Sequence, residues 1–186
     1  LFRSTTDEWA LARPLVDRFR LILRFEHYSV EDMTTLISRR ARSASVVLED
    51  GVAEMIAARS RGTPRIGIRL LDACIRTMQA EATGTVSAAT FTRTCELEQL
   101  DPLGLDIIEQ RYLTLLRESQ SSVRLNVLAS SLGLPRQTIE RSIEPTLIRL
   151  GLIEKDDAGR VLTERGWQHL GGRQHQQAAA LPSQGV

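Results

Sequence analysis

The chain has 186 residues and is almost neutral, with 24 lysine and arginine residues against 23 aspartate and glutamate residues. A chain of this length can form two small domains, each with its own modest core. The charge balance excludes a strongly basic field over the whole chain, and apolar runs broken by charges every few residues exclude a membrane-spanning helix. Aromatic residues make up only 4% of the sequence, so aliphatic side chains must build the core, which favours helices.

The cysteines indicate the compartment of the protein, and the first residue indicates whether the chain is complete. Cys74 and Cys95 lack the spacing of metal ligands and lie in helical patterns, which predicts small, half-buried free thiols. With no secretory signal in view, this use of cysteine predicts a cytoplasmic protein. The chain opens on Leu1 and not on a methionine, which indicates a piece of a longer protein.

The first 28 residues predict two strands with a short element between them. Residues 1–6 are typical of a buried strand that ends in the polar run up to Thr6. Pro14 starts the short element, and alternating apolar and polar residues over 20–28 predict the second strand.

Four helices are predicted next, joined by short polar turns into a small bundle. Ser29 is the expected N-cap of the first helix, with Asp32 in the third helical position of a capping box. Pro64 opens the third helix, and Gly84 ends it. The four helices span about 29–44, 50–59, 64–83 and 87–100.

The turn-rich run at 101–104 predicts a domain boundary. The elements beyond it follow the order helix, helix, turn, helix and β-hairpin, which is typical of a winged helix. The tail after Leu170 is rich in glutamine, alanine and glycine, which predicts disorder. The helices span about 106–118, 125–132 and 136–150, and the strands about 152–154 and 160–162.

Two arginines are candidates for contact with phosphate. Arg65 follows Gly62-Thr63-Pro64 at the start of a helix, where its charge opposes the helix dipole, so either a bound anion or simple surface exposure explains it. Arg18 is either a structural arginine paired with Asp17 or Glu26, or a guanidinium offered to a phosphate across a subunit interface.

The predicted winged helix gives a mixed signal for DNA. Its third helix shows a mixed set of charges, with Glu144 among the residues expected on the surface. Its hairpin, the wing, holds Lys155 and Arg160 but also Asp156 and Asp157, so phosphate contact and protein binding both remain open. No catalytic triad is seen, and the three histidines fit no metal template.

Several of these stretches together resemble the RuvB family of Holliday junction branch migration helicases, which are AAA+ ATPases. The resemblance covers about residues 1–170. Its specific parts are the runs Arg61-Gly62-Thr63-Pro64-Arg65 and Glu144-Pro145 at their mutual spacing. It also includes Pro14-Leu15-Val16-Asp17-Arg18-Phe19, where Val16 replaces an arginine that is usual in the family.

The resemblance implies a mostly α fold with four parts. Residues 1–28 match the end of the AAA+ α/β core, with the sensor-1 and arginine-finger regions. Residues 29–100 match a helical AAA+ lid that carries sensor 2, and 101–170 match a winged-helix DNA-binding domain. Residues 171–186 are left as a disordered tail.

The resemblance also implies roles for single residues. Thr6 matches sensor 1 and Arg18 the interface arginine, which are the catalytic candidates. Tyr28 and Arg65, with Arg18, match nucleotide-contacting residues. The DNA-binding candidates, Lys155 and Arg160, match two wing arginines. The wing departs from the family pattern, since it has lost one arginine and gained two aspartates.

For the whole protein, the family implies an ATP- and Mg²⁺-dependent homo-hexamer around double-stranded DNA. It would drive branch migration of four-way junctions in recombination and repair, with a RuvA-like junction-binding partner. Lys155 is the sole lysine and follows no glycine, so the chain has no phosphate-binding loop of the Walker type and is expected to be inactive alone. The alternatives are a non-catalytic winged-helix module that binds DNA or protein, and an AAA+ relative whose winged helix binds protein.

Overall fold

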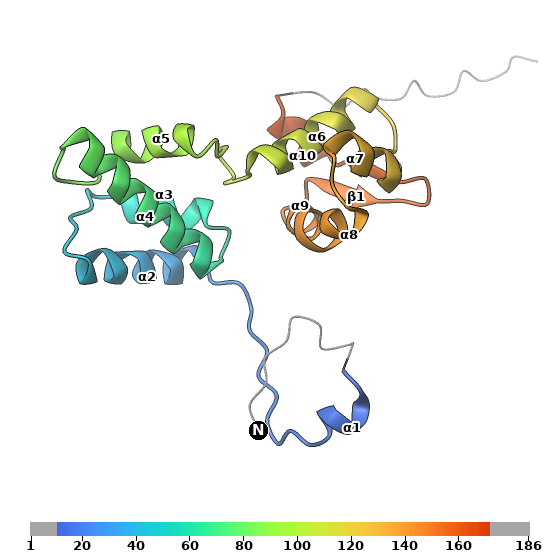
Figure 1. Ribbon diagram of the computed structural model, residues 1–186, viewed down its shortest axis with the longest axis horizontal. Helices are drawn as coiled ribbons and strands as arrows, with labels where there is room; N and C mark the ends of the chain where they lie inside the picture. The colour runs from blue at the N-terminus through green and yellow to red at the C-terminus, as the bar shows by residue number, and fades with distance from the viewer. Residues whose placement is uncertain (1–10, 172–186) are drawn as a thin grey trace, which may run out of the picture.

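The computed structural model describes residues 11–171, and helices dominate it. Figure 1 shows helices α2–α5 gathered in one unit and α6–α10 with the hairpin in a second, while α1 lies apart on an extended segment. The expectations for residues 1–6, Thr6 included, and for 172–186 lie outside the described residues. The helices are α1 (Arg13–Val16), α2 (Val30–Ser43), α3 (Val52–Arg59), α4 (Pro64–Glu81), α5 (Ala88–Leu97), α6 (Ile107–Ser119), α7 (Leu125–Leu132), α8 (Arg136–Thr138), the π-helix η2 (Ile139–Ile143), α9 (Glu144–Arg149) and α10 (Glu164–His169); the strands are β1 (Ile153–Lys155) and β2 (Arg160–Leu162).

The first unit is the predicted four-helix bundle. Ser29 caps α2 as expected: its Oγ accepts a hydrogen bond from the Asp32 backbone N–H at 3.0 Å. Pro64 occupies the first turn of α4, where its missing N–H costs nothing. The four helices bury one continuous cluster, and its fully buried members include Ile37, Val52, Ile56, Leu71, Cys74, Val86 and Phe91.

The free thiols belong to this same cluster. Cys74 and Cys95 are both buried and unpaired, which confirms the expectation of free cysteines and shows deeper burial than expected. Burial raises the pKa of Cys74 to about 11, so its thiol stays protonated at neutral pH.

The second unit is a winged helix. Asp106 and Glu109 form a capping box at the start of α6, and α7 packs on α6 while the third helix packs on α7. The hairpin pairs β1 with β2 in antiparallel register, with Ile153 opposite Leu162. A separate core fills this unit, and its fully buried members include Leu105, Tyr112, Leu113, Leu128, Ile139, Leu147 and Leu152.

The third helix of this unit is unbroken over 136–149, as predicted, but a π-helical stretch interrupts its α-helical geometry. It begins as α8, widens into η2 and continues as α9. Pro145 explains the interruption because it has no N–H to donate and its ring clashes with the carbonyl four residues earlier. A π-turn placed before the proline accommodates both constraints.

One further expectation was wrong, and one helix was missed. Residues 20–28 form no strand, and Phe25 is 91% exposed. A strand needs a partner, and no other strand lies beside this segment within residues 11–171. Helix α10 was not predicted; its signal was Thr163, whose Oγ1 caps the helix by accepting from the Gly166 N–H at 3.0 Å. No helix in the described part of the chain is long and apolar enough to cross a membrane.

The two units meet in the predicted boundary at 101–104. Asp101 organises this turn, because its Oδ1 accepts from the backbone N–H groups of Leu103 and Leu105 at 2.8 Å. Gly104 has φ +75° and lies against the end of α3, where a Cβ would stand 2.2 Å from the Arg59 carbonyl oxygen. Only glycine satisfies both the backbone conformation and the close approach.

We expect Gly104→Ala to destabilise the contact between the two units. The matched control is Gly133→Ala, at φ +67° with nothing within 4 Å of an added Cβ, which carries only the left-handed backbone cost of roughly 1–2 kcal/mol. Urea unfolding measures both variants in this chain. A loss of unfolding free energy no larger for Gly104→Ala than for Gly133→Ala would contradict the prediction.

Candidate functional site

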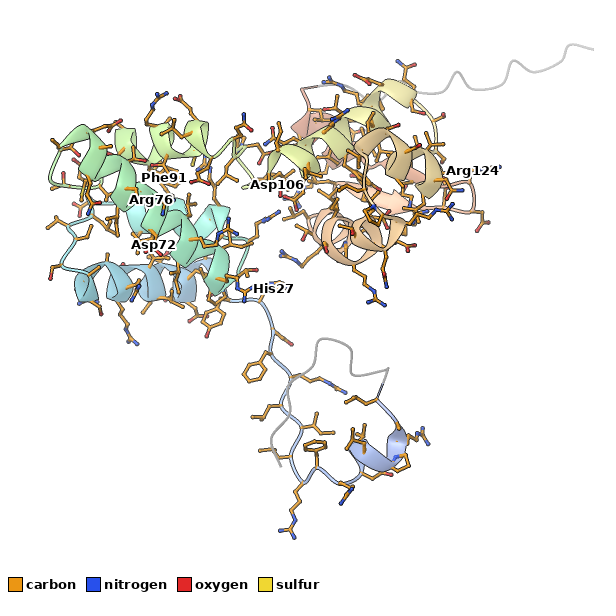
Figure 2. All side chains as sticks on the ribbon, viewed as in Figure 1. His27, Asp72, Arg76, Phe91, Asp106 and Arg124 are labelled. Atoms are coloured by element: carbon orange, nitrogen blue, oxygen red, sulfur yellow. The ribbon has the colours of Figure 1, made fainter. Side chains whose placement is uncertain are left out.

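The turn between α3 and α4 brings together residues that the sequence keeps far apart. The Tyr28 backbone N–H donates to the Gly62 carbonyl oxygen at 2.9 Å. Gly62 has φ +70°, and a Cβ there would stand 2.6 Å from the Tyr28 carbonyl oxygen. The extended segment that ends at His27 is therefore tied to this turn, as Figure 2 shows where the segment enters the bundle. Tyr28 and Arg65 consequently lie at the same end of the bundle.

Arg65 stands in the first turn of α4 with its side chain exposed. Within residues 11–171 it makes no hydrogen bond and no ion pair. The first turn of α4 carries no acidic residue and Thr63 provides no side-chain cap, so nothing there offsets the positive end of the helix dipole. The helix start and the unpaired guanidinium both favour an anion at this place.

Arg18 lies in the turn that follows α1, and Figure 1 shows α1 apart from the bundle of α2–α5. Its side chain is exposed. Among the described residues it pairs with neither Asp17 nor Glu26, so the structural alternative for this arginine lacks a partner.

The wing residues face inward, onto a carboxylate of the third helix. Glu144 is fully buried, contrary to the expectation that it is exposed. Arg160 Nε lies 2.7 Å from Glu144 Oε1, and Lys155 Nζ lies 2.5 Å from Glu144 Oε2. The Arg160 side chain is only 15% exposed, against 42% for Lys155. Both predicted DNA-binding residues therefore neutralise a buried charge of their own domain.

The pKa values of Glu144 and Tyr112 agree with this arrangement of side chains. Burial alone would raise the pKa of the Glu144 carboxyl, but hydrogen bonds from Arg160 and Lys155 outweigh it and hold that pKa below its ordinary value. Burial, with the nearby Glu144 charge, raises the pKa of Tyr112. Tyr112 stays neutral and donates its hydroxyl to Glu144 Oε1 at 3.1 Å.

The two aspartates of the wing differ in role. Asp156 closes the turn: its carboxylate accepts from the Ser122 hydroxyl at 2.5 Å and from the Gly159 N–H at 2.6 Å. These two bonds lower the pKa of Asp156. Asp157 is exposed and forms no hydrogen bond or ion pair with any described side chain, so its charge faces solvent.

Other cations of the winged helix are more accessible than Arg160. Arg124 stands just before α7 and beside the wing, where Val123 pairs with Arg160 through the backbone, and Figure 2 shows it at the outer edge of the domain. Arg136 opens the third helix, and Arg141 lies in η2. All three arginines are exposed. Sequence analysis missed the contrast with Arg160 because burial of Glu144 was not foreseen.

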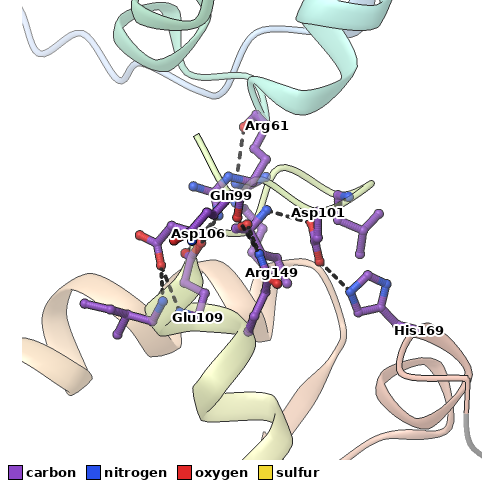
Figure 3. A network of polar contacts seen from close by, with 11 residues as sticks. Arg61, Gln99, Asp101, Asp106, Glu109, Arg149 and His169 are labelled. Carbon is purple, nitrogen blue, oxygen red and sulfur yellow. Dashed lines mark hydrogen bonds and ion pairs between the residues drawn. The ribbon is translucent and has the colours of Figure 1, made fainter. Parts of the chain in front are cut away.

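A polar network at the boundary between the units was also missed (Figure 3). Arg61 Nη1 lies 2.8 Å from both carboxylate oxygens of Glu109, and Arg149 donates to the Arg61 carbonyl oxygen at 3.2 Å. His169 and Asp101 form a second pair at 2.7 Å. No sequence signal predicts partners 48 residues apart. Within residues 11–171, no group of acidic, histidine and cysteine side chains is suited to a metal ion.

We expect Glu144→Gln to destabilise the winged helix by roughly 1.5–3 kcal/mol, because the charged hydrogen bonds from Arg160 and Lys155 are lost. Since the folded-state pKa of Glu144 is depressed, its contribution is present above the ordinary value of 4.5 and disappears as pH falls below it. The control Glu140→Gln removes an exposed partner 3.5 Å from the same arginine, which contributes about 0–1 kcal/mol. Thermal unfolding at pH 7 and pH 3 measures both; equal losses in the two variants at pH 7 would argue against the prediction.

Comparison with known proteins identifies both units. A model of the RuvB AAA lid domain matches residues 28–101, and a model of the RuvB C-terminal winged helix domain matches residues 102–171. The Holliday junction branch migration complex subunit RuvB of Rubrobacter xylanophilus is 35% identical over 173 residues, which make up 92% of this chain and 49% of that protein.

Solved structures agree with this assignment. The Thermotoga maritima RuvB Holliday junction branch migration motor superposes with a TM-score of 0.78 at 35% identity, over 88% of this chain and 55% of that one. A point mutant of the same protein gives a TM-score of 0.78 at 34% identity, over 87% and 55%. The chain thus spans about half the length of the relatives it matches. Its mostly helical fold is a RuvB-type lid followed by a RuvB-type winged helix, and the chain belongs to the RuvB family.

Proposed function

We propose that this chain is the lid and DNA-binding part of a RuvB-like, ATP-driven motor that moves four-way DNA junctions in recombination and repair. One observation carries the proposal: the turn that holds Arg65 and Tyr28 at one end of the lid is also the place where the winged helix is attached. A nucleotide contact and a DNA-binding domain therefore share one structural support. Residues 1–28 would contribute the end of the ATPase core, with 29–100 as the lid and 101–170 as the winged helix.

In this proposal the nucleotide is ATP with Mg²⁺, bound mainly by residues outside this chain. Arg65, which has no partner among residues 11–171, would contact the phosphates from the start of α4, and Tyr28 would lie beside the nucleotide. Arg18, which is exposed, suits a contact with ATP bound to a neighbouring subunit, where a guanidinium stabilises the charge that develops during phosphoryl transfer. Thr6 would sense the terminal phosphate. By itself the chain is expected to hydrolyse no ATP.

The assembly proposed for the whole protein follows its relatives. The Rubrobacter xylanophilus protein is named as a subunit of a branch migration complex. We infer a homo-hexamer around double-stranded DNA that works with a RuvA-like junction-binding protein in the cytoplasm. Cys74 and Cys95, free and buried, fit a reducing compartment.

For the DNA contact, accessibility separates the two wing candidates. Lys155 is 42% exposed and reaches the surface despite its bond to Glu144, whereas Arg160 is 15% exposed with its guanidinium on Glu144. We therefore propose Lys155 as the phosphate contact of the wing, with Arg160 as the residue that holds the wing in place. Arg124, exposed beside the wing, would add a second contact.

A second candidate function is a winged helix that binds protein. The observation that favours it is the charge of the wing surface: Glu144 neutralises the inward-facing cations, while Asp157 and Glu154 are exposed. Such a surface attracts duplex DNA only weakly.

The nucleotide part is tested by Arg65→Ala in the full-length protein. Loss of a charge-assisted phosphate contact should weaken ATP binding by roughly 1.5–3 kcal/mol and slow hydrolysis, with the fold intact. The control is Arg93→Ala, which removes an exposed arginine of α5 that pairs only with Glu96 in the described residues. A fluorescent ATP analogue and a hydrolysis assay measure both variants. Unchanged affinity and rate in Arg65→Ala would refute the role of this residue.

The DNA part is tested on this chain by fluorescence anisotropy with a labelled duplex and a labelled four-way junction. We expect weak, sequence-independent binding, and Lys155→Gln should reduce the slope of log affinity against log salt by about 1. Asp157→Asn should strengthen binding, most clearly at low salt, because screening shortens the reach of its charge. Asp156 is left unchanged because it holds the wing turn together.

Arg165→Gln serves as the matched control, since this exposed arginine lies on α10 and outside both the wing and the third helix. Absence of duplex and junction binding at low salt, even in Asp157→Asn, would exclude a DNA contact by the wing. The protein-binding function would then be preferred for this domain.

A further inference from the structure

The turn between α3 and α4 contacts three separate parts of the molecule within four residues. Arg59 donates to the Asp101 carbonyl oxygen at 3.2 Å, and its guanidinium lies 4.8 Å from the centre of the Phe91 ring. Arg61 binds Glu109, and Gly62 accepts from Tyr28. The turn therefore holds the incoming segment, the boundary and the winged helix at once.

The bond from Arg61 to Glu109 is the most enclosed contact between the two units. The side chains are 11% and 6% exposed, and a single guanidinium nitrogen lies 2.8 Å from each carboxylate oxygen. Arg61 Nε is buried and has no hydrogen-bond partner among the described residues, so the pair depends on this one nitrogen. Arg61 has φ +54°, a backbone conformation that costs energy for a side chain other than glycine. The same left-handed conformation occurs at or just after the ends of other helices of the described chain, at Ser45, Ala82, Gln99 and Gln120.

Glu109 is also fixed to the helix that it begins. Its Oε2 accepts from the Asp106 backbone N–H at 3.0 Å, while Asp106 accepts from the Glu109 N–H at 2.9 Å. The carboxylate that holds Arg61 therefore has a defined position at the start of α6. Any displacement of the turn is passed to the axis of α6, and α6 packs against α7 and β2 in the core of the winged helix.

We propose that Arg61 and Glu109 are positioning residues that couple the nucleotide-contacting turn to the orientation of the winged helix. The inference rests on the proposed function for the nature of the signal, which is ATP bound near Arg65. Arg65 stands in the first turn of α4, four residues after Arg61. A shift of Arg65 towards phosphate therefore moves Arg61 with it. The winged helix then moves with Arg61, because Glu109 is bonded both to Arg61 and to the backbone at the start of α6.

A purely structural role for Glu109, as the cap of α6, predicts different behaviour. Glu109→Gln keeps an amide oxygen that accepts from the Asp106 N–H, so the cap of α6 is preserved while the ion pair with Arg61 is lost. The matched control is Arg76→Gln, which breaks the pair with Glu98 inside the lid, where the side chains are 65% and 42% exposed. Both residues of that pair belong to the lid, so only the first variant removes an ion pair between the two units.

The first measurement uses this chain alone. Spin labels at Thr35→Cys on α2 and Asn126→Cys on α7, both exposed sites, report the distance between the two units by electron double resonance. The native thiols are buried and are not expected to take up label in the folded chain. We expect a narrow distance distribution in the parent and in Arg76→Gln, and a broad one in Arg61→Gln and in Glu109→Gln. The double variant should be no broader than either single one, because the two residues act as a unit.

The second measurement uses the full-length protein on a four-way junction. The number of base pairs migrated for each ATP hydrolysed should fall about tenfold in Glu109→Gln, within the usual range of coupling between sites. ATP hydrolysis and junction affinity should stay within about twofold of the parent, because neither ligand touches this pair. A structural role alone would lower ATP hydrolysis and the amount of junction bound together, through loss of folded protein, and would leave the ratio of base pairs to ATP unchanged.

The outcomes separate the two proposals. A full-length parent protein that hydrolyses no ATP would overturn the proposed function. An unchanged distance distribution in Glu109→Gln would overturn the present inference, whatever the parent does. So would an unchanged ratio of base pairs to ATP in a variant whose distances have broadened.

Discussion

The buried ion pair of Arg61 with Glu109 joins two helical units whose buried apolar side chains fall into two separate clusters. Because apolar packing is not directional, a shared core would tolerate small rotations between the units. A charged hydrogen bond between buried side chains is directional and is costly to leave half made. The relative orientation of lid and winged helix therefore depends on a few polar atoms, and Gly104 lets the backbones come close enough for these atoms to meet.

Buried carboxylates are used twice in this way. Glu109 takes the charge of Arg61 across the boundary, and Glu144 takes those of Lys155 and Arg160 across the wing. In both cases a buried glutamate on a helix fixes a segment that would otherwise be held by only a few backbone hydrogen bonds. The same arrangement withdraws cations from the surface. The wing turn holds two basic and two acidic residues, but both basic side chains bind Glu144. A count of wing residues therefore overstates the positive charge that a phosphate outside the protein meets there.

Much of the fold could be predicted from local patterns. The helix starts at Ser29 and Pro64 follow from capping chemistry, and the hairpin follows from two short apolar runs around a turn. Failures occurred where a distant partner decides the outcome. The segment 20–28 has the alternation of a strand but no neighbouring strand within residues 11–171. The π-geometry is a different case: its cause, Pro145, is visible in the sequence, but helical spacing alone treats the run as regular.

The candidate site likewise contains residues that local sequence predicts and residues whose placement depends on distant partners. Placement of Arg65 at a helix start was confirmed, because the Gly62-Thr63-Pro64 run specifies it locally. That Tyr28 joins the same turn depends on a backbone bond to a residue 34 positions later, which spacing alone does not reveal. The burial of Glu144 was missed because its partners come from a different element, and helical spacing gave it a surface position.

Lys155 has a practical consequence of its own, since it is the sole lysine among 24 basic residues. Apart from the α-amino group of the chain, an amine-reactive reagent has one target, and that target lies on the wing in contact with Glu144. The rate of acylation thus reports how often the wing side chain leaves its internal partner. A lysine-specific protease likewise has one cleavage point, at the end of β1, so opening of the hairpin can be followed as the conversion of one band into two.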